Sequence, residues 1–277
     1  MPKAALLTLN SSDDPIENCG VVLDMLAQAA EGGADIAFTP EVTNCVSTNR
    51  AHQHAVLEAE GQDRTLSAIQ ETARNLNIWV SIGSLALKGD GVDPRFVNRS
   101  FLISNTGDIL ARYDKMHMFD VNVSETESYR ESSGYAPGNR AVTAKTPFAV
   151  MGLTICYDLR FPYLYRHLAQ SGADVLSVPS AFSAATGEAH WEPLLRARAI
   201  ENGAYVFAAA QTGHHREKGG PKRRTYGHSL AVSPWGDVVF DGGGDVGVGF
   251  VDFDVAEVTR ARARIPSLKH DRAYGAD

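Results

Sequence analysis

The sequence is poor in cysteine and has no long apolar run. Its three cysteines, Cys19, Cys45 and Cys156, lie far apart in 277 residues and form no C-x-x-C pair. This spacing indicates neither a disulfide framework nor a zinc knuckle, and it favours reduced thiols in a cytoplasmic protein. The apolar part of "MPKAALLTLN" is too short to span a membrane and has no small-residue cleavage pattern. We therefore expect a first strand here, a cytoplasmic location and no membrane partner.

Positive charge is also scarce. Asp and Glu (33) outnumber Lys and Arg (26), which gives a net charge of -7 and a pI of about 5.7. This balance argues against nucleic acid as a partner, because phosphate contacts need clustered Lys and Arg. The histidines form no H-x-x-x-H or H-x-H pair on an expected helix or strand, so no metal is expected. Neither a G-x-x-x-x-G-K-[ST] motif nor a G-x-G-x-x-G fingerprint between a strand and a helix occurs, so no cofactor is expected.

Helices and strands follow from hydrophobic spacing and end signals. Asp14 and Pro15 open an expected helix that Gly32-Gly33 ends. Its apolar stripe should consist of Ile16, Cys19, Leu23, Leu26 and Ala30. Farther on, "LSAIQETARNLN" predicts a helix, "IWVSIGSLAL" a strand and "RSFLISNTGDILARYDK" a hairpin. The C-terminal "SPWGDVVFDGG" and "GVGFVDFD" predict more strand.

One pattern occurs more than once. "EGGADIAFTPE" (31–41) resembles "AQSGADVLSVPS" (169–180), and "ENGAYVFAAAQT" (201–212) is a looser copy. Each follows a helical segment and leads through a glycine into an apolar strand. Such units predict an α/β fold with helices layered on sheets, and we expect one domain, residues 1–277. Ligands of these folds collect at the carboxyl ends of strands, so functional residues should lie just after the strands.

Two polar segments are expected to be surface loops. Residues 120–140, "DVNVSETESYRESSGYAPGNR", are long and lack periodicity, and loops of that length are usually functional or disordered. Residues 214–224, "HHREKGGPKRR", are basic and predict a mobile surface loop. The alternative is that this loop draws in an anionic substrate through His214, His215, Lys218, Lys222, Arg223 and Arg224. "RARAR" (260–264) is expected to be a solvated face.

Three reactive side chains follow apolar runs. Glu41 follows "IAFTP", Lys115 follows "ILARYD" and Cys156 follows "MGLTI". If the three strands are neighbours, a carboxylate, an ammonium and a thiol converge at one rim. The carboxylate can deprotonate the thiol, the ammonium favours the thiolate, and both the ammonium and the Tyr157 N–H can stabilise an oxyanion. Taken singly, each residue has a structural interpretation as a packed cysteine, a solvated carboxylate or a surface lysine.

A Cys–His pair is an alternative in principle. His117 or His228 would then be the base, although Glu41 and Lys115 make such a base unnecessary. Whether Cys45, four residues after Glu41, lines a pocket or only packs stays open.

Together the three motifs resemble those of the carbon–nitrogen hydrolase (nitrilase) superfamily. "FTPE", "RYDKMHMFD" and "GLTICYDLRFP" are similar to its glutamate, lysine and cysteine motifs, in the same order. The resemblance implies a four-layer α-β-β-α sandwich of the nitrilase type that forms a homodimer or larger homo-oligomer. It implies Glu41, Lys115 and Cys156 as catalytic residues, with a second glutamate in the loop after the lysine. Glu131 in "YRESSGYAPG" is the better match, and Glu125 and Glu127 are its competitors.

A longer segment resembles one branch of this family. "PSAFSAATGEAHWEPLLRARAIENGAYVFAAAQTGHH" and "RTYGHS" are similar to the branch that contains deaminated glutathione amidase, which is close to the ω-amidases. This implies hydrolysis of a small linear carboxamide, first deaminated glutathione, through a thioester. The close alternative is α-ketoglutaramate, and N-carbamoyl amides or nitriles would use the same residues. A non-catalytic interaction protein is the alternative from another class, against which the intact motifs argue.

Substrate contacts are expected around the strand end at residues 179–187, which are small and suited to a pocket wall. The side chains that could face the substrate are Ser180, Phe182 and Thr186. Arg160 and Arg198 are candidates for binding substrate carboxylates, with structural ion pairs as the equal alternative. The residues expected to begin the next helix, and to pack at a subunit contact, are His190, Trp191 and Glu192.

Overall fold

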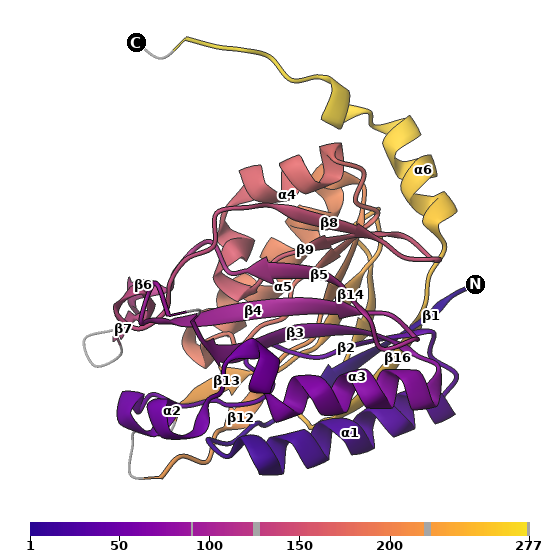
Figure 1. The fold of residues 1–277 in the computed structure, drawn as a ribbon. Helices are drawn as coiled ribbons and strands as arrows, with labels where there is room; N and C mark the ends of the chain where they lie inside the picture. The colour runs from indigo at the N-terminus through magenta and orange to yellow at the C-terminus, as the bar shows by residue number, and fades with distance from the viewer. Residues whose placement is uncertain (90, 124–127, 219–222, 276–277) are drawn as a thin grey trace.

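The computed structural model describes residues 1–89, 91–123, 128–218 and 223–275. Two six-stranded sheets lie face to face, and helices cover their outer faces (Figure 1). Apolar side chains of α1 (Pro15–Glu31) and α3 (Arg64–Leu76) pack on the first sheet. Those of α4 (Pro162–Gln170) and α5 (Ala184–Asn202) pack on the second. The α-β-β-α sandwich implied by the motifs is confirmed.

The strands of the first sheet, in the order β16-β1-β2-β3-β4-β5, are Gly247–Asp252, Lys3–Thr8, Ile36–Phe38, Trp79–Lys88, Phe96–Ile103 and Ile109–Asp114. Those of the second, in the order β8-β9-β10-β11-β14-β15, are Val142–Lys145, Val150–Leu153, Val175–Ser177, Tyr205–Ala208, Leu230–Val232 and Val238–Asp241. Two small hairpins pair β6 with β7 and β12 with β13, whose bounds are Asp120–Asn122, Ser128–Arg130, Thr212–His214 and Arg224–Tyr226. The remaining elements are the helices α2 (Arg50–Val56) and α6 (Val255–Arg264) and the 3₁₀ turns η1 (Glu60–Gln62), η2 (Glu131–Ser133), η3 (Cys156–Arg160) and η4 (Ser267–Lys269).

The two sheets repeat one arrangement. In each, three parallel strands (β1-β2-β3 and β9-β10-β11) are flanked by antiparallel ones. The strands β2 and β10 occupy the same central place, so the repeated Gly-Ala-Asp pattern marks equivalent strands. The looser third copy lies on β11, which corresponds to β3. The predicted hairpin is also confirmed, as β4 and β5 pair antiparallel.

The ends of α1 form as predicted, but its buried face does so only in part. The Asp14 carboxylate accepts hydrogen bonds at the first turn, and Gly32-Gly33 ends the helix, with Gly33 at φ +76°. Ile16 is exposed and Cys19 only half-buried, so the expected stripe is wrong at these two positions, whereas Leu23, Leu26 and Ala30 pack on the first sheet as predicted. The buried residues are Asn18, Val22, Met25, Leu26 and Ala29. Asn18 lies inside because its amide donates to two loop carbonyls, a polar contact that hydrophobic spacing does not predict.

Helix α5 begins earlier than expected. It starts at Ala184, so the wall at residues 179–187 is partly helical and the His-Trp-Glu segment lies inside the helix. Trp191 is buried and donates its indole N–H to the carbonyl of His228 (2.8 Å). Its neighbours His190 and Glu192 are exposed.

The basic segments are more structured than expected. Residues 212–226 contain the β12–β13 hairpin, and His215 is buried, so a plain surface loop is the wrong description; Lys222 lies outside the described residues. In "RARAR", Arg262 is half-buried and donates to two backbone carbonyls, while its neighbours Arg260 and Arg264 are exposed.

His52 and His54 form an H-x-H pair on α2, a helix that the sequence did not predict. Residues two apart on a helix point in different directions, and here His52 hydrogen-bonds the carbonyl of Asp13 whereas His54 packs on the ring of Phe96. In the described parts of the chain, no three His, Cys, Asp or Glu gather as a metal site would need. Nor is any helix in these parts long and apolar enough to cross a membrane.

Candidate active site

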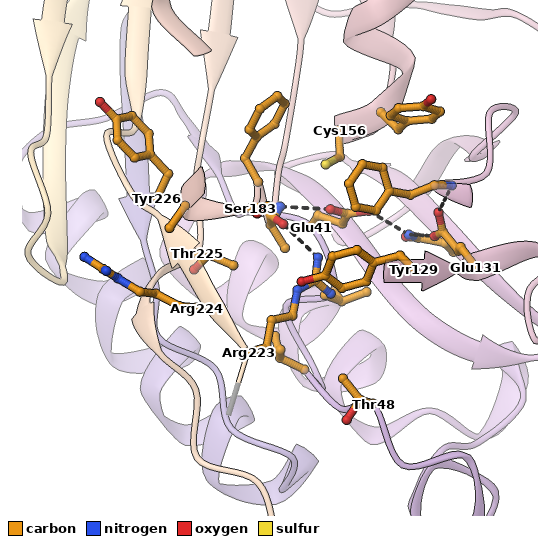
Figure 2. Close-up of a pocket in the computed structure, with 18 of the residues that line it drawn as sticks. Glu41, Thr48, Tyr129, Glu131, Cys156, Ser183, Arg223, Arg224, Thr225 and Tyr226 are labelled. Carbon is orange, nitrogen blue, oxygen red and sulfur yellow. Dashed lines mark hydrogen bonds between the residues drawn. The ribbon is translucent and has the colours of Figure 1, made fainter. Parts of the chain in front are cut away.

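The three motif residues meet although their strands are not neighbours. Glu41 follows β2 and Lys115 follows β5, and two other strands separate these in the first sheet. Cys156 follows β9 of the second sheet and begins η3. The side chains of Glu41, Cys156 and Glu131 lie together in Figure 2, at the ends of both sheets. Face-to-face stacking of the sheets, and not adjacency of strands, therefore creates the common rim.

Lys115 is held between two carboxylates. Its Nζ lies 2.8 Å from Glu41 Oε1, and 2.8 and 3.0 Å from the two carboxylate oxygens of Glu131. Only 2% of the lysine side chain is exposed. Burial by itself lowers the pKa of Lys115, but Glu131 and Glu41 outweigh it and raise the pKa well above its ordinary value. Of the three loop glutamates considered, Glu131 contacts the lysine, and its competitors Glu125 and Glu127 lie outside the described residues.

Glu41 is a buried and ionised carboxylate. Besides Lys115, it accepts hydrogen bonds from Asn98 Nδ2 (2.9 Å) and from the N–H of Ala181 (2.8 Å). Burial tends to raise the pKa of Glu41, but the charges of Lys115 and Arg223 lower it to about 2. The Cys156 thiol lines the same cavity, close enough for the charge of this carboxylate to raise the pKa of the thiol.

Cys156 occupies a strained turn between strand and 3₁₀ helix. Its φ of +48° lies in a region that residues with a side chain rarely adopt, and its N–H donates to the carbonyl of Pro179 (2.9 Å). Burial raises the pKa of the thiol, the charge of Glu41 raises it further, and Lys115 partly opposes the rise. The resting site therefore pairs a neutral thiol with an ionised carboxylate. A thiolate forms here when the proton moves to Glu41.

The next residue offers a free backbone donor. Among the described residues, no acceptor takes the N–H of Tyr157, and Tyr157 lines the cavity that contains the thiol. This N–H belongs to the residue directly after Cys156, and the Lys115 ammonium contacts Glu41. Both are therefore candidate donors to an oxyanion formed at this site.

The two histidines that could replace Glu41 have other partners. His117 Nδ1 lies 2.6 Å from Asp158, which also accepts the N–H of Ile155 (2.9 Å) and so orders the turn before the nucleophile. His228 Nδ1 lies 3.0 Å from Asp241. Within the described part of the chain neither imidazole hydrogen-bonds the thiol, so the alternative Cys–His pair is not formed.

A cavity of about 1260 Å³ is lined by Glu41, Lys115, Glu131 and Cys156. Phe182 and Thr186 line it, as predicted for substrate contacts, and Cys45 lines it too. Ser180 does not, because it is fully buried and its hydroxyl donates to the carbonyl of Val178 (3.2 Å).

The arginines expected to bind the substrate point elsewhere. Arg160 lies outside the described lining, with its guanidinium 3.2 Å from His190 and over the ring of Phe182. Arg198 is buried, donates twice to the carbonyl of Leu159 and pairs with Glu201 (3.2 Å), as its alternative, a structural ion pair, predicted. The cations that do line the cavity are Lys115, Arg50, Arg130, Arg223 and Arg224.

Two functional contacts were not predicted from the sequence. Asn98 in β4 donates to Glu41, and its signal was a lone amide within the apolar run of "FVNRSFLI". Arg223 reaches Ala181 beside the carboxylate (Figure 2), but nothing in "HHREKGGPKRR" shows which of its cations turns inward.

Comparisons with known proteins extend over the same residues. A family model described as carbon-nitrogen hydrolase matches residues 3–263. A protein named deaminated glutathione amidase from Yersinia enterocolitica is 37% identical over 269 residues, which cover 97% of this chain and 92% of that protein.

Two solved structures are similar to this one. The NitFhit protein of C. elegans has a TM-score of 0.90 at 37% identity; the match covers 98% of this chain, which spans only 65% of that protein. An amidase variant from Nesterenkonia sp. AN1, in which acrylamide has added to the active-site cysteine, has a TM-score of 0.78 at 26% identity and covers 96% of this chain and 98% of its own.

Proposed function

The chain belongs to the carbon–nitrogen hydrolase family, and from this premise we propose that it is a cysteine-dependent amidase. The observation that carries the proposal is the buried ammonium of Lys115 between Glu41 and Glu131, in the cavity that the Cys156 thiol also lines, close enough to Glu41 for that charge to raise the pKa of the thiol. A nucleophile, a base and a cation gathered in one cavity are the parts that acyl transfer through a covalent intermediate requires. The proposed steps use only groups of the protein and water.

In the first half-reaction, Glu41 takes the thiol proton, and the sulfur of Cys156 attacks the amide carbon. The carbonyl oxygen becomes an oxyanion that Lys115 and the N–H of Tyr157 stabilise. Protonated Glu41 then gives the proton to the amide nitrogen. The C–N bond breaks, the amine or ammonia leaves, and a thioester remains on the sulfur.

In the second half-reaction, Glu41 acts as base again. It takes a proton from water, and the resulting hydroxide attacks the thioester carbon. The C–S bond breaks, the carboxylic acid is released, and Glu41 returns its proton to the Cys156 thiolate. One carboxylate therefore serves both half-reactions, which fits its position within reach of the thiol.

The lysine couples oxyanion and base. At rest, Lys115 lowers the pKa of Glu41 and keeps it ionised. When the oxyanion forms, it competes with Glu41 for the Lys115 ammonium. The interaction between Lys115 and Glu41 then weakens, and the proton affinity of Glu41 rises. Glu131 contacts the lysine from the other side and is proposed to position it.

For the substrate we propose a small linear carboxamide, first deaminated glutathione, because the similar protein of Y. enterocolitica bears that name. The bond cleaved would be the amide of the 2-oxoglutaramate moiety. The catalytic groups would treat α-ketoglutaramate, an N-carbamoyl amide or a nitrile in the same way, so relative kcat/KM values on a panel of these compounds decide between them. Equal or greater efficiency on α-ketoglutaramate would overturn the first choice.

Removal of the nucleophile tests the activity itself. Cys156→Ala and Cys156→Ser should each lower kcat by about 10⁴-fold or more, because the covalent route is lost. The release of 2-oxoglutarate from deaminated glutathione measures this, with circular dichroism as a check of folding. Cys19→Ala on α1 is the matched control and should keep wild-type turnover. Wild-type turnover by Cys156→Ala would refute the mechanism.

We also propose a cytoplasmic homodimer or larger homo-oligomer. The three cysteines are unpaired, which suits a reducing compartment. Large apolar side chains are exposed at the end of α5 and around β15, namely Ile200, Trp235, Val238 and Val239. Light scattering of the purified chain tests the assembly, and a mass equal to one chain would exclude it.

A further inference from the structure

The cavity carries more positive charge than the proposed reaction uses. Its described lining contains five lysine or arginine side chains and three carboxylates, Glu41, Glu131 and Glu188, a formal excess of two, in a chain whose net charge is -7. The chemistry employs one of the five cations, Lys115. Guanidinium groups at a cavity wall are suited to hold a carboxylate, because their N–H groups match its two oxygens.

Two of the four arginines are already occupied. Arg50 donates to Gln53 (2.8 Å), and its guanidinium lies over the ring of Tyr135 (4.9 Å). Arg130 donates to three oxygens of its own hairpin, those of Val121, Asn122 and Tyr129. These contacts stabilise the cavity wall and leave few donors for a ligand.

Arg223 has donors to spare. It donates from Nη2 to the carbonyl of Ala181 (2.8 Å), while its Nε is buried and has no hydrogen-bond partner among the described residues. No carboxylate of the described residues forms an ion pair with it. A buried N–H of a charged group without an acceptor costs free energy, and a ligand oxygen would remove that cost. The ring of Tyr129 covers one face of the guanidinium (5.6 Å), which leaves its edge for hydrogen bonding.

Arg223 and Glu41 both hydrogen-bond the backbone of Ala181. The N–H of Ala181 donates to Glu41 (2.8 Å), and the carbonyl of Ala181 accepts from Arg223 (2.8 Å). In Figure 2 the guanidinium of Arg223 points toward Glu41, with Tyr129 beside it. The charge of Arg223 is close enough to lower the pKa of Glu41 and to oppose the raised pKa of Cys156. A carboxylate bound at this guanidinium would therefore lie only a few bonds from the amide carbon.

The backbone of Arg223 is fixed in place. The N–H of His215 donates to the Arg223 carbonyl (2.9 Å), and the N–H of Tyr226 donates to the carbonyl of Phe182 (3.0 Å), which docks β13 against the cavity wall. The buried imidazole of His215 adds a contact to Thr225 (2.7 Å). A residue held this way loses little further conformational freedom when it binds a ligand.

We propose that Arg223 binds a carboxylate of the substrate, through its Nε–H and an Nη–H to two oxygens, and so selects amides that carry a carboxylate a few bonds from the scissile bond. This inference rests on the proposed amidase function and narrows its substrate class. Arg223, and not Arg160 or Arg198, is then the specificity residue.

Three primary or secondary amides separate the possible positions of that carboxylate. Glutaramate carries it on the acyl part, N-pentanoylglycine on the leaving amine, and pentanamide carries none. Arg223→Met should lower kcat/KM on at least one carboxylate-bearing amide about 100-fold more than on pentanamide. The probe affected shows which part of the substrate the arginine binds. Arg223→Lys should recover only part of the loss, because an ammonium keeps the charge but not the paired donors.

Arg64→Met is the control, since this arginine lies on α3, outside the described cavity lining, with 78% of its side chain exposed; it should change all three kcat/KM values by less than about threefold. An equal loss on all three amides in Arg223→Met, or no loss on any, would overturn the inference while leaving the amidase function intact. A wild-type protein that hydrolyses none of the three, nor deaminated glutathione, would instead overturn the proposed function and the inference with it.

Discussion

Replacing Glu131 with glutamine tests what holds the catalytic ammonium in place. Glu131 accepts hydrogen bonds from Lys115 at both oxygens (2.8 and 3.0 Å) and from the N–H of Phe119 (2.7 Å). Glutamine keeps the shape but has one acceptor oxygen and one NH₂ group. If the oxygen serves Phe119, the NH₂ group faces the ammonium of Lys115, where a donor meets a donor. Glu131→Gln therefore removes a negative charge and at least one charge-assisted hydrogen bond from a lysine that is 2% exposed.

The size of the effect follows from these contacts. A hydrogen bond between charged groups contributes about 1.5–3 kcal/mol, and water cannot replace it at a buried lysine. Without Glu131, Lys115 interacts with Glu41 alone, which holds the base more tightly and makes it a weaker proton acceptor. At about 1.4 kcal/mol per factor of ten, kcat should fall about 10- to 150-fold. KM should change little, because Glu131 contacts the lysine and not the cavity's arginines.

Steady-state kinetics on the amide that the wild-type protein hydrolyses best, with urea unfolding in parallel, measures both quantities. Glu188→Gln is the matched control: this exposed glutamate lines the same cavity, and its loss should leave kcat within about twofold. Glu131→Asp keeps the charge but withdraws it by one carbon, so it should also be slow. A folded Glu131→Gln protein with wild-type kcat would show that Lys115 needs no second carboxylate, and the reasoning would fail.

Two further predictions concern stability. Burial raises the pKa of Asp63 from 3.8 to about 6. The stability contributed by its protonated carboxyl is therefore fully present below pH 3.8 and is lost as the pH rises through 6. Asp63→Asn keeps the cap of α3 and removes this titration. Relative to wild type, Asp63→Asn should therefore gain about 2 kcal/mol in free energy of unfolding between pH 4 and pH 7, measured by urea unfolding, and a difference that does not vary with pH would contradict the assignment. A Cβ on Gly83 would lie 2.0 and 2.6 Å from the carbonyl oxygens of Thr39 and Pro40 and 2.4 Å from Pro179 Cβ, between the loops that carry Glu41 and contact Cys156. Gly83→Ala should lower the free energy of unfolding by about 3 kcal/mol or more and lower kcat. Gly61→Ala, with no atom within 4 Å of its Cβ, should lower the free energy of unfolding far less. Equal melting temperatures for the two variants would show that these loops separate freely.

Much of the fold was predictable because its signals are local. The helix ends at Asp14 and Gly32-Gly33 depend on groups a few residues away, and each Gly-Ala-Asp repeat marks a strand in an equivalent place of one sheet. The buried face of α1 was not fully predictable from hydrophobic spacing, since Asn18 is drawn inside by loop carbonyls. Likewise, α5 starts at Ala184 after Ser183, a common N-cap residue type whose side chain does not cap this helix, so the local signal was weak.

By itself, the sequence determined which chemistry is available: a carboxylate, an ammonium and a thiol, each just after an apolar strand, in the order that the family motifs share. Only the tertiary structure decided that strands from two different sheets bring them together, and that Glu131 completes the set through Lys115. It also decided which cations line the cavity. A guanidinium turns toward whichever carbonyls the fold presents, so Arg198 turns to Leu159 and Arg223 to Ala181. These partners lie 39 and 42 residues away along the chain, which places them beyond the reach of any local pattern.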